Sequence, residues 1–341
     1  MPTNETWLGL VRETPIDPER PIVDPHHHLW DTRQSRYLLD ELTADLGEGH
    51  RVVATVFVEC MSMYRADGPA HLRPVGETEF VNGIAAQSTS GQYGATRVAA
   101  GIVGHADLTL GAAVDEVLDA HVAAAPARFR GIRHAAGFDP HDEIRNSHTN
   151  PPDGLLRRPE FREGVKRLAR HQLSFDAWLY HHQIPELTDL ARSCPDVTIV
   201  LDHFGGPLGI GPYAGKREEI FARWRKDIAE LGRCPNVVAK LGGINMSVNG
   251  FGWHRRDRPP TSDELVTATR DYYLHAVDVF GPDRSMFESN FPVDKLSCSY
   301  GVLWNAFKKI AQGFSAAESA KLFHDTASNV YRLADIRQIS A

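Results

Sequence analysis

The strongest constraint on the fold is a repeated alternation of short apolar runs with longer stretches of helical periodicity. Eight runs rich in β-branched residues are expected to be strands, and most are followed by a helical pattern. Several runs are apolar throughout, which is typical of parallel strands covered by helices. Eight such units without a linker predict an α/β fold of the (β/α)8 TIM-barrel type. The runs begin near residues 21, 51, 97, 129, 173, 197, 236 and 284.

The 341 residues suit one large barrel with an extension and insertions. We expect residues 1–21 to form an N-terminal extension and residues 22–341 to form a single barrel domain. Irregular stretches near 138–155 and 248–260 each follow a predicted strand, so they are candidate lids or substrate loops on the face where barrels bind ligands. A doubly wound open sheet is the alternative, but it would normally place a glycine-rich loop after the first strand, where histidines stand here.

Charge and hydropathy limit the kinds of partner that the chain is expected to bind. The formal net charge is -7 and no tract is rich in lysine or arginine, which argues against nucleic acid. The first twenty residues lack the apolar core of a secretory signal, and no later run is as long as a membrane span. We therefore expect a cytoplasmic protein with a small-molecule substrate and no membrane partner. Homo-oligomerisation is left open.

Histidines gather at the predicted carboxyl ends of the strands, where the chemistry of barrels takes place. In "VDPHHHLWD", His26 and His28 are two apart and so face the same side, while His27 faces away. "YHHQIPE" adds His181 after the fifth strand, and "LDHFGGP" adds His203 after the sixth. Imidazoles from three strands suit a mononuclear metal or a proton-transfer site.

Four further side chains are candidates for contacting a substrate. Arg133 ends the fourth strand and could hold a carboxylate or carbonyl with its planar fork, with His134 beside it. Lys240 ends the seventh strand and could donate to an oxyanion. Tyr64 could supply an aromatic wall. Ion pairs within the fold, or core packing for the tyrosine, are the alternative roles.

The motifs "VDPHHHLWD", "FRGIRH", "LDHFGGP", "FESNFPVD" and "SAKLFHDTASNVYRL" resemble the amidohydrolase superfamily, amidohydrolase-2 branch, over residues 22–333. The branch includes pyrone-dicarboxylate lactonases, sugar lactonases and metal-dependent decarboxylases of aromatic acids. The resemblance implies that His26, His28, His181 and His203 match the family's histidines. It also implies that Asn290 stands where the family usually has an aspartate that binds metal or moves a proton.

Asn290 changes the expected chemistry, because an amide can donate, accept or orient but has no usable basicity. Its loss of charge also weakens the case for a tightly held cation. Asp294 and Glu59 are the carboxylates that could compensate, Asp294 being the preferred base. A site with one divalent metal ion, expected to be zinc on the four histidines, and a metal-free site are therefore both kept open.

The expected function is a hydrolase that opens a lactone or related cyclic ester of a small organic acid with activated water. A metal-dependent decarboxylase of an aromatic or unsaturated acid is the first alternative. A barrel that only binds a ligand is the second, motivated by the missing aspartate. The catalytic candidates are His26, His28, His181, His203, Asn290 and Asp294.

Overall fold

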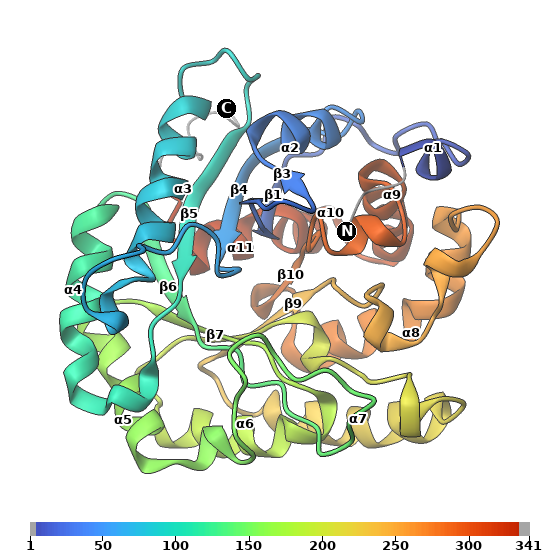
Figure 1. Cartoon of the computed structure of the whole chain (residues 1–341). Coiled ribbons are helices and arrows are strands. Elements are labelled where there is room, and N and C mark those ends of the chain that lie inside the picture. Colours follow the sequence, from blue (N-terminus) through green and yellow to red (C-terminus); the bar gives the residue numbers. More distant parts are fainter. Residues whose placement is uncertain (1–4, 334–341) are drawn as a thin grey trace.

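The computed structural model describes residues 5–333, and the ends of the expected domain ranges, residues 1–4 and 334–341, lie outside this part. Eight parallel strands form one sheet in the order β1-β4-β5-β6-β7-β8-β9-β10. Helices surround this sheet on the outside (Figure 1). The predicted (β/α)8 barrel is therefore confirmed. The strands are β1 (Ile22–His27), β4 (Val52–Val58), β5 (Arg97–Gly104), β6 (Phe129–Arg133), β7 (Ser174–Ala177), β8 (Ile199–Leu201), β9 (Val237–Leu241) and β10 (Ser285–Phe287).

The first and last strands close the barrel through the residues that follow β10. His27 and Phe291 form a parallel bridge, and the His28 amide donates to the Phe291 carbonyl at 2.8 Å. The Asn290 amide donates to the His26 carbonyl at 2.9 Å. The backbone that carries the predicted histidines is thus bonded directly to the backbone that carries Asn290.

Two apolar layers hold the barrel together. Strand residues that point outward pack against the surrounding helices, and valines such as Val56, Val103 and Val200 fill the interior. Burial on both sides explains why the strands are apolar throughout rather than alternating. Tyr331, just after α11 (Thr326–Val330), packs with this interior cluster, and its hydroxyl donates to Asp176 at 2.6 Å.

The helices on the outer surface begin where local sequence satisfies their first amides. The hydroxyl of Thr261 accepts from the Glu264 amide, while the Glu264 carboxylate accepts from the Thr261 amide, and this reciprocal cap begins α8. None of the helices in residues 5–333 combines the length and the apolar character needed to cross a membrane. The helices are α1 (Glu5–Leu8), α2 (Leu39–Leu46), α3 (Val75–Ser88), α4 (Asp115–Ala124), α5 (Pro159–Arg167), α6 (Ile184–Ser193), α7 (Arg217–Leu231), α8 (Ser262–Phe280), α9 (Tyr300–Ile310), α10 (Ala316–Ala320) and α11.

The two irregular stretches follow β6 and β9 and contain only short turns of helix, such as Leu155–Arg157 and Trp253–Arg255. A two-stranded ribbon, β2 (Trp30–Asp31) with β3 (Arg36–Tyr37), follows β1. Residues from all three segments line one cavity at the carboxyl end of the barrel. Loops after the strands therefore build the walls of the site, as is general in this fold.

Candidate functional site

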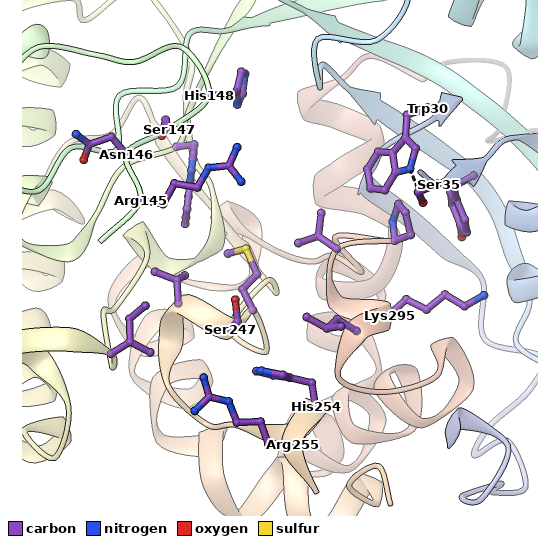
Figure 2. A pocket seen from close by; sticks show the side chains of 18 of the residues that line it. Trp30, Ser35, Arg145, Asn146, Ser147, His148, Ser247, His254, Arg255 and Lys295 are labelled. Carbon is purple, nitrogen blue, oxygen red and sulfur yellow. Dashed lines mark hydrogen bonds between the residues drawn. The ribbon is translucent and has the colours of Figure 1, made fainter. Parts of the chain in front are cut away.

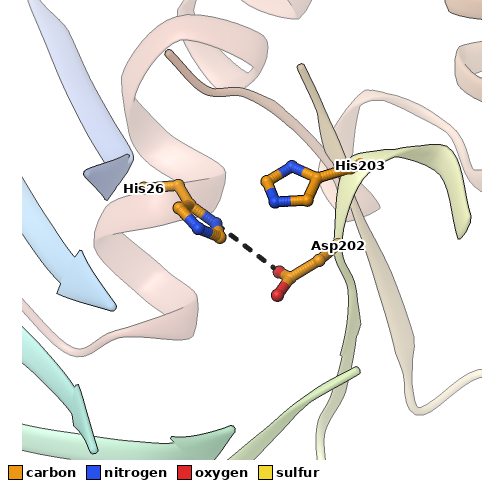
Figure 3. A group of neighbouring side chains, drawn as sticks. All are labelled: His26, Asp202 and His203. Atoms are coloured by element: carbon orange, nitrogen blue, oxygen red, sulfur yellow. Dashed lines mark ion pairs between the residues drawn. The ribbon is translucent and has the colours of Figure 1, made fainter. Parts of the chain in front are cut away.

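Two strand ends bring two histidines and a carboxylate together inside the barrel. His26 lies in β1, and Asp202 and His203 directly follow β8. Potential ligand atoms of the three side chains lie within 4.8 Å of one another, and all three residues are buried (Figure 3). The Nδ1 atom of His26 is 3.7 Å from Oδ1 of Asp202. We call His26, Asp202 and His203 the His–Asp cluster.

Glu288, directly after β10, connects the two rings of the His–Asp cluster. Its Oε2 is 2.8 Å from Nδ1 of His26, and its Oε1 is 2.6 Å from Nδ1 of His203. Burial opposes the charged form of Glu288, but His203 and His26 outweigh burial and lower its pKa to about 2. Burial, with the charge of Lys240, lowers the pKa of His26. An ionised Glu288 therefore orients both imidazoles through Nδ1.

Two ion pairs flank the cluster, and each is neutral by itself. Nε of Arg133 lies 2.7 Å from Oε1 of Glu59, and Nζ of Lys240 lies 2.7 Å from Oδ2 of Asp176. Lys240 Nζ is also 3.3 Å from Oδ1 of Asp202 and 3.3 Å from Nδ1 of His26. These two cations face four carboxylates, those of Glu59, Asp176, Asp202 and Glu288, so two negative charges remain in excess when the imidazoles are neutral.

Asp202 is the least satisfied of these buried groups. Arg133 Nη1 approaches its Oδ2 only to 3.8 Å. Neither carboxylate oxygen of Asp202 accepts a hydrogen bond from any residue in the described range, although the side chain is fully buried. A buried carboxylate without hydrogen bonds is costly, so this one indicates a missing partner such as a cation or a bound water.

Two glycines make room for the cluster. Gly243 has a φ of +66°, and a Cβ added to it would overlap the ring of His203. A Cβ added to its neighbour Gly242 would overlap Glu288. The "LGG" at the end of β9 is thus needed for backbone to pass close to both side chains.

The structure places three more predicted residues beside the cluster. The ring of His28 lies 4.9 Å from that of His26, and its Nδ1 donates to the Val58 carbonyl at 2.8 Å. Asn290 has a φ of +56° and donates from Nδ2 to Oδ1 of Asp294 at 3.1 Å. Burial raises the pKa of Asp294 to about 7. Asn290 and Asp294 therefore act as a hydrogen-bonded pair next to the site.

Three other predicted residues lie apart from the cluster. His181 packs against His182 and Tyr213 and accepts from the Leu208 amide at 3.3 Å, and burial lowers its pKa to about 3. His134 and Tyr64 line a second cavity of about 420 Å³.

A cavity of about 760 Å³ lies at the carboxyl end of the barrel (Figure 2). Two contacts connect it to the charged residues below. The ring of Trp178 packs edge-on to that of His203 at 5.0 Å, and Nε2 of His148 is 3.1 Å from Oε2 of Glu59. The cluster thus lies under the floor of a space large enough for a small organic molecule. Its aromatic lining consists of Trp7, Trp30, Tyr37, Trp178 and Tyr180.

The sequence reading did not identify three acids that shape the site: Asp176, Asp202 and Glu288. Each lies within or directly after an apolar strand, as in "IVLD" and "MFE". An acid that interrupts an otherwise buried run is the signal that could have found them, because a buried carboxylate requires a partner.

The donors and the charge of the cluster fit a divalent metal ion. Imidazole and carboxylate are ligands that zinc takes in proteins. A carboxylate bonded to the second nitrogen of a metal-binding histidine, as Glu288 is here, commonly orients such ligands. If Nε2 of His26 binds a metal ion, its long contact of 3.4 Å with Nη1 of Arg133 has to break. These residues form a possible metal site.

The comparisons with known proteins agree with this architecture. The amidohydrolase family matches residues 23–333. The Sinorhizobium fredii protein y4mH, described as uncharacterized, is 36% identical, over 92% of this chain and 98% of its own length. An L-fucono-1,5-lactonase from Burkholderia multivorans is 26% identical, over 91% of this chain and 96% of its own.

A solved structure of an amidohydrolase from Burkholderia multivorans with bound zinc has a TM-score of 0.69 and 25% sequence identity. It covers 92% of this chain and 99% of that one. The family match spans nearly the whole barrel, including both strand ends of the His–Asp cluster. The chain belongs to the amidohydrolase family of hydrolases.

Proposed function

We propose that this chain hydrolyses a lactone with water activated at the His–Asp cluster. The observation that carries the proposal is the buried carboxylate of Asp202, which lies beside two histidines and under a substrate-sized cavity, with both oxygens free of hydrogen bonds from described residues. The similarity to an L-fucono-1,5-lactonase supports a lactone as the substrate class.

Opening a lactone requires a group that takes a proton from water and a positive group near the carbonyl oxygen. Asp202 has two available oxygens, so one can accept the proton. Arg133 is kept charged by Glu59, so it can donate to the oxygen that becomes an oxyanion. Glu288 keeps the rings of His26 and His203 in place while the charge develops.

A divalent metal ion bound by His26, Asp202 and His203 would supply Lewis acidity and would lower the pKa of water at the site. The roles of Arg133 and Glu288 are the same with or without it. His28 presents Nε2 as an acceptor, because its Nδ1 hydrogen is committed to Val58.

The test measures hydrolysis of a panel of sugar lactones and carboxylated lactones as the release of acid at constant pH. We expect Asp202→Asn to lower kcat/KM about a thousand-fold and His203→Ala about a hundred-fold, with folding checked by circular dichroism. His71→Ala is the matched control, because His71 pairs with Glu116 on the surface. Release of carbon dioxide from aromatic acids, with no lactone opened, would sink the proposal in favour of a decarboxylase.

A further inference from the structure

The two irregular loops each place an arginine without an ion-pair partner in the wall of the cavity. Arg145 comes from the loop after β6, and Arg255 comes from the loop after β9. Figure 2 shows Arg145 reaching into the cavity and Arg255 at its lower edge, next to His254. No carboxylate of residues 5–333 lies within 4.0 Å of either guanidinium, and neither donates a side-chain hydrogen bond within that range.

The other cations around the cavity are already neutralised. Arg36 pairs with Asp40 and Glu41, Arg256 pairs with Glu264, and Lys295 pairs with Asp45 and Glu5. Within the described chain, Glu143 is the single acidic residue of the lining, and it forms no ion pair with either loop arginine. The wall therefore keeps unmatched positive charge, in a protein whose formal net charge is -7.

The position of this charge relative to the cluster decides what it can recognise. The floor of the cavity contacts the cluster through Trp178 and His203, and it contacts the flanking Arg133–Glu59 ion pair through His148. A substrate whose ester lies on the floor extends its remaining groups toward the loops. Guanidinium groups there match a planar or tetrahedral oxyanion better than they match neutral hydroxyl groups.

Resting on the proposed lactonase function, we propose that the substrate is a lactone that also carries an anionic oxyacid group, which Arg145 and Arg255 bind. The group is a carboxylate or a phosphate, and a sugar lactone without either binds less well. The loops after β6 and β9 thus select the substrate class, while the His–Asp cluster performs the hydrolysis.

The experiment compares three lactones of similar ring: gluconolactone, which is neutral, glucarolactone, which carries a carboxylate, and phosphogluconolactone, which carries a phosphate. We expect a lower KM for at least one anionic lactone than for gluconolactone. Arg145→Gln and Arg255→Gln should each raise that KM about ten-fold and leave the KM of gluconolactone unchanged. The anionic lactone with the lower KM shows whether the two arginines bind a carboxylate or a phosphate. Added salt should weaken binding of the anionic lactone alone.

Arg233→Gln is the matched control, because Arg233 is an exposed arginine at the end of α7, paired with Glu230 and not part of the cavity lining. Equal KM values for neutral and anionic lactones, unaffected by the two substitutions, would overturn the inference while leaving lactone hydrolysis intact.

The corresponding lactams, which are not hydrolysed in this way, separate the two proposals. Calorimetry should show tighter binding of the anionic lactam by the unmodified chain, and loss of that preference in the double variant of Arg145 and Arg255. If this preference holds while no lactone is opened, the anion site stands and the hydrolytic function fails. If neither lactam nor lactone shows a charge preference, the anion site is wrong whatever the activity.

Discussion

At the scale of single residues, the carboxylate that position 290 lacks is present two residues earlier. Glu288 hydrogen-bonds with His203 and lies within ion-pair distance of His26, while Asn290 is turned toward Asp294. The amide at position 290 therefore does not leave the imidazoles without a charged partner. The Asn290 amide instead donates a hydrogen bond to the buried carboxyl group of Asp294, so the nearest polar neighbour of Asp294 is uncharged.

Asn290→Asp should destabilise the fold in a pH-dependent way. The substitution puts two buried carboxyl groups in contact, and Asp294 already has a pKa raised to about 7 by burial. Below that pH the pair can share a proton, whereas above it both groups must ionise. We expect the free energy of unfolding to fall by about 2 kcal/mol above pH 7 and by much less below it, as measured by urea unfolding.

Asn150→Asp is the control for this change, because Asn150 is exposed and also has a positive φ, of +48°. Equal losses for the two variants at every pH would show that contact with Asp294 is not the cause.

At the scale of elements, the turn after β9 is as important to the site as the strands that carry its side chains. Gly242 and Gly243 let this backbone pass against Glu288 and His203. The loops after β6 and β9 then add the cavity walls. The strand ends thus carry the side chains of the site, and the turns leave the space that these side chains occupy.

Gly243→Ala should damage the site with little effect on the rest of the fold. Its Cβ would push the His203 ring away from Glu288, so we expect kcat/KM for the lactone to fall about a hundred-fold. Gly215→Ala is the matched control, because Gly215 has a φ of +74° and no atom within 4 Å of an added Cβ. Both variants should lose about 1 kcal/mol of stability from backbone strain. Similar activity in the two would contradict the steric role of Gly243.

Sequence reading was most successful for the strands. Strands such as β4 and β5 are runs of mostly buried residues rich in valine, and burial on two sides leaves that pattern in the sequence itself. The carboxylates of the site leave a weaker pattern in the sequence. Asp176 and Glu288 look like isolated acids in apolar runs, and their partners Lys240 and His203 come from other strands. The position of His181 was equally hard to predict, because it lies in a turn of helix beyond the end of β7.

At the scale of the whole molecule, a bound dication should stabilise the fold, because it would compensate the two negative charges buried at the cluster. Protein purified without chelator should contain about one equivalent of zinc or a similar metal. Its removal should lower the Tm by several degrees, since a ligand that binds only the folded state stabilises that state. Asp202→Asn should carry little metal, whereas His71→Ala should retain it. Chelation that leaves the Tm unchanged would show that protons, not a metal, balance the charge.

The closure of the barrel has a consequence for how the protein is made. His26 belongs to the first strand, but Glu288 and the Phe291 carbonyl that fix its surroundings follow the last strand. A nascent chain on the ribosome therefore exposes "HHH" long before it can assemble the pocket around it. A chain that stops before β10 lacks Glu288 and Phe291, so the surroundings of His26 are complete only when the two ends of the barrel meet.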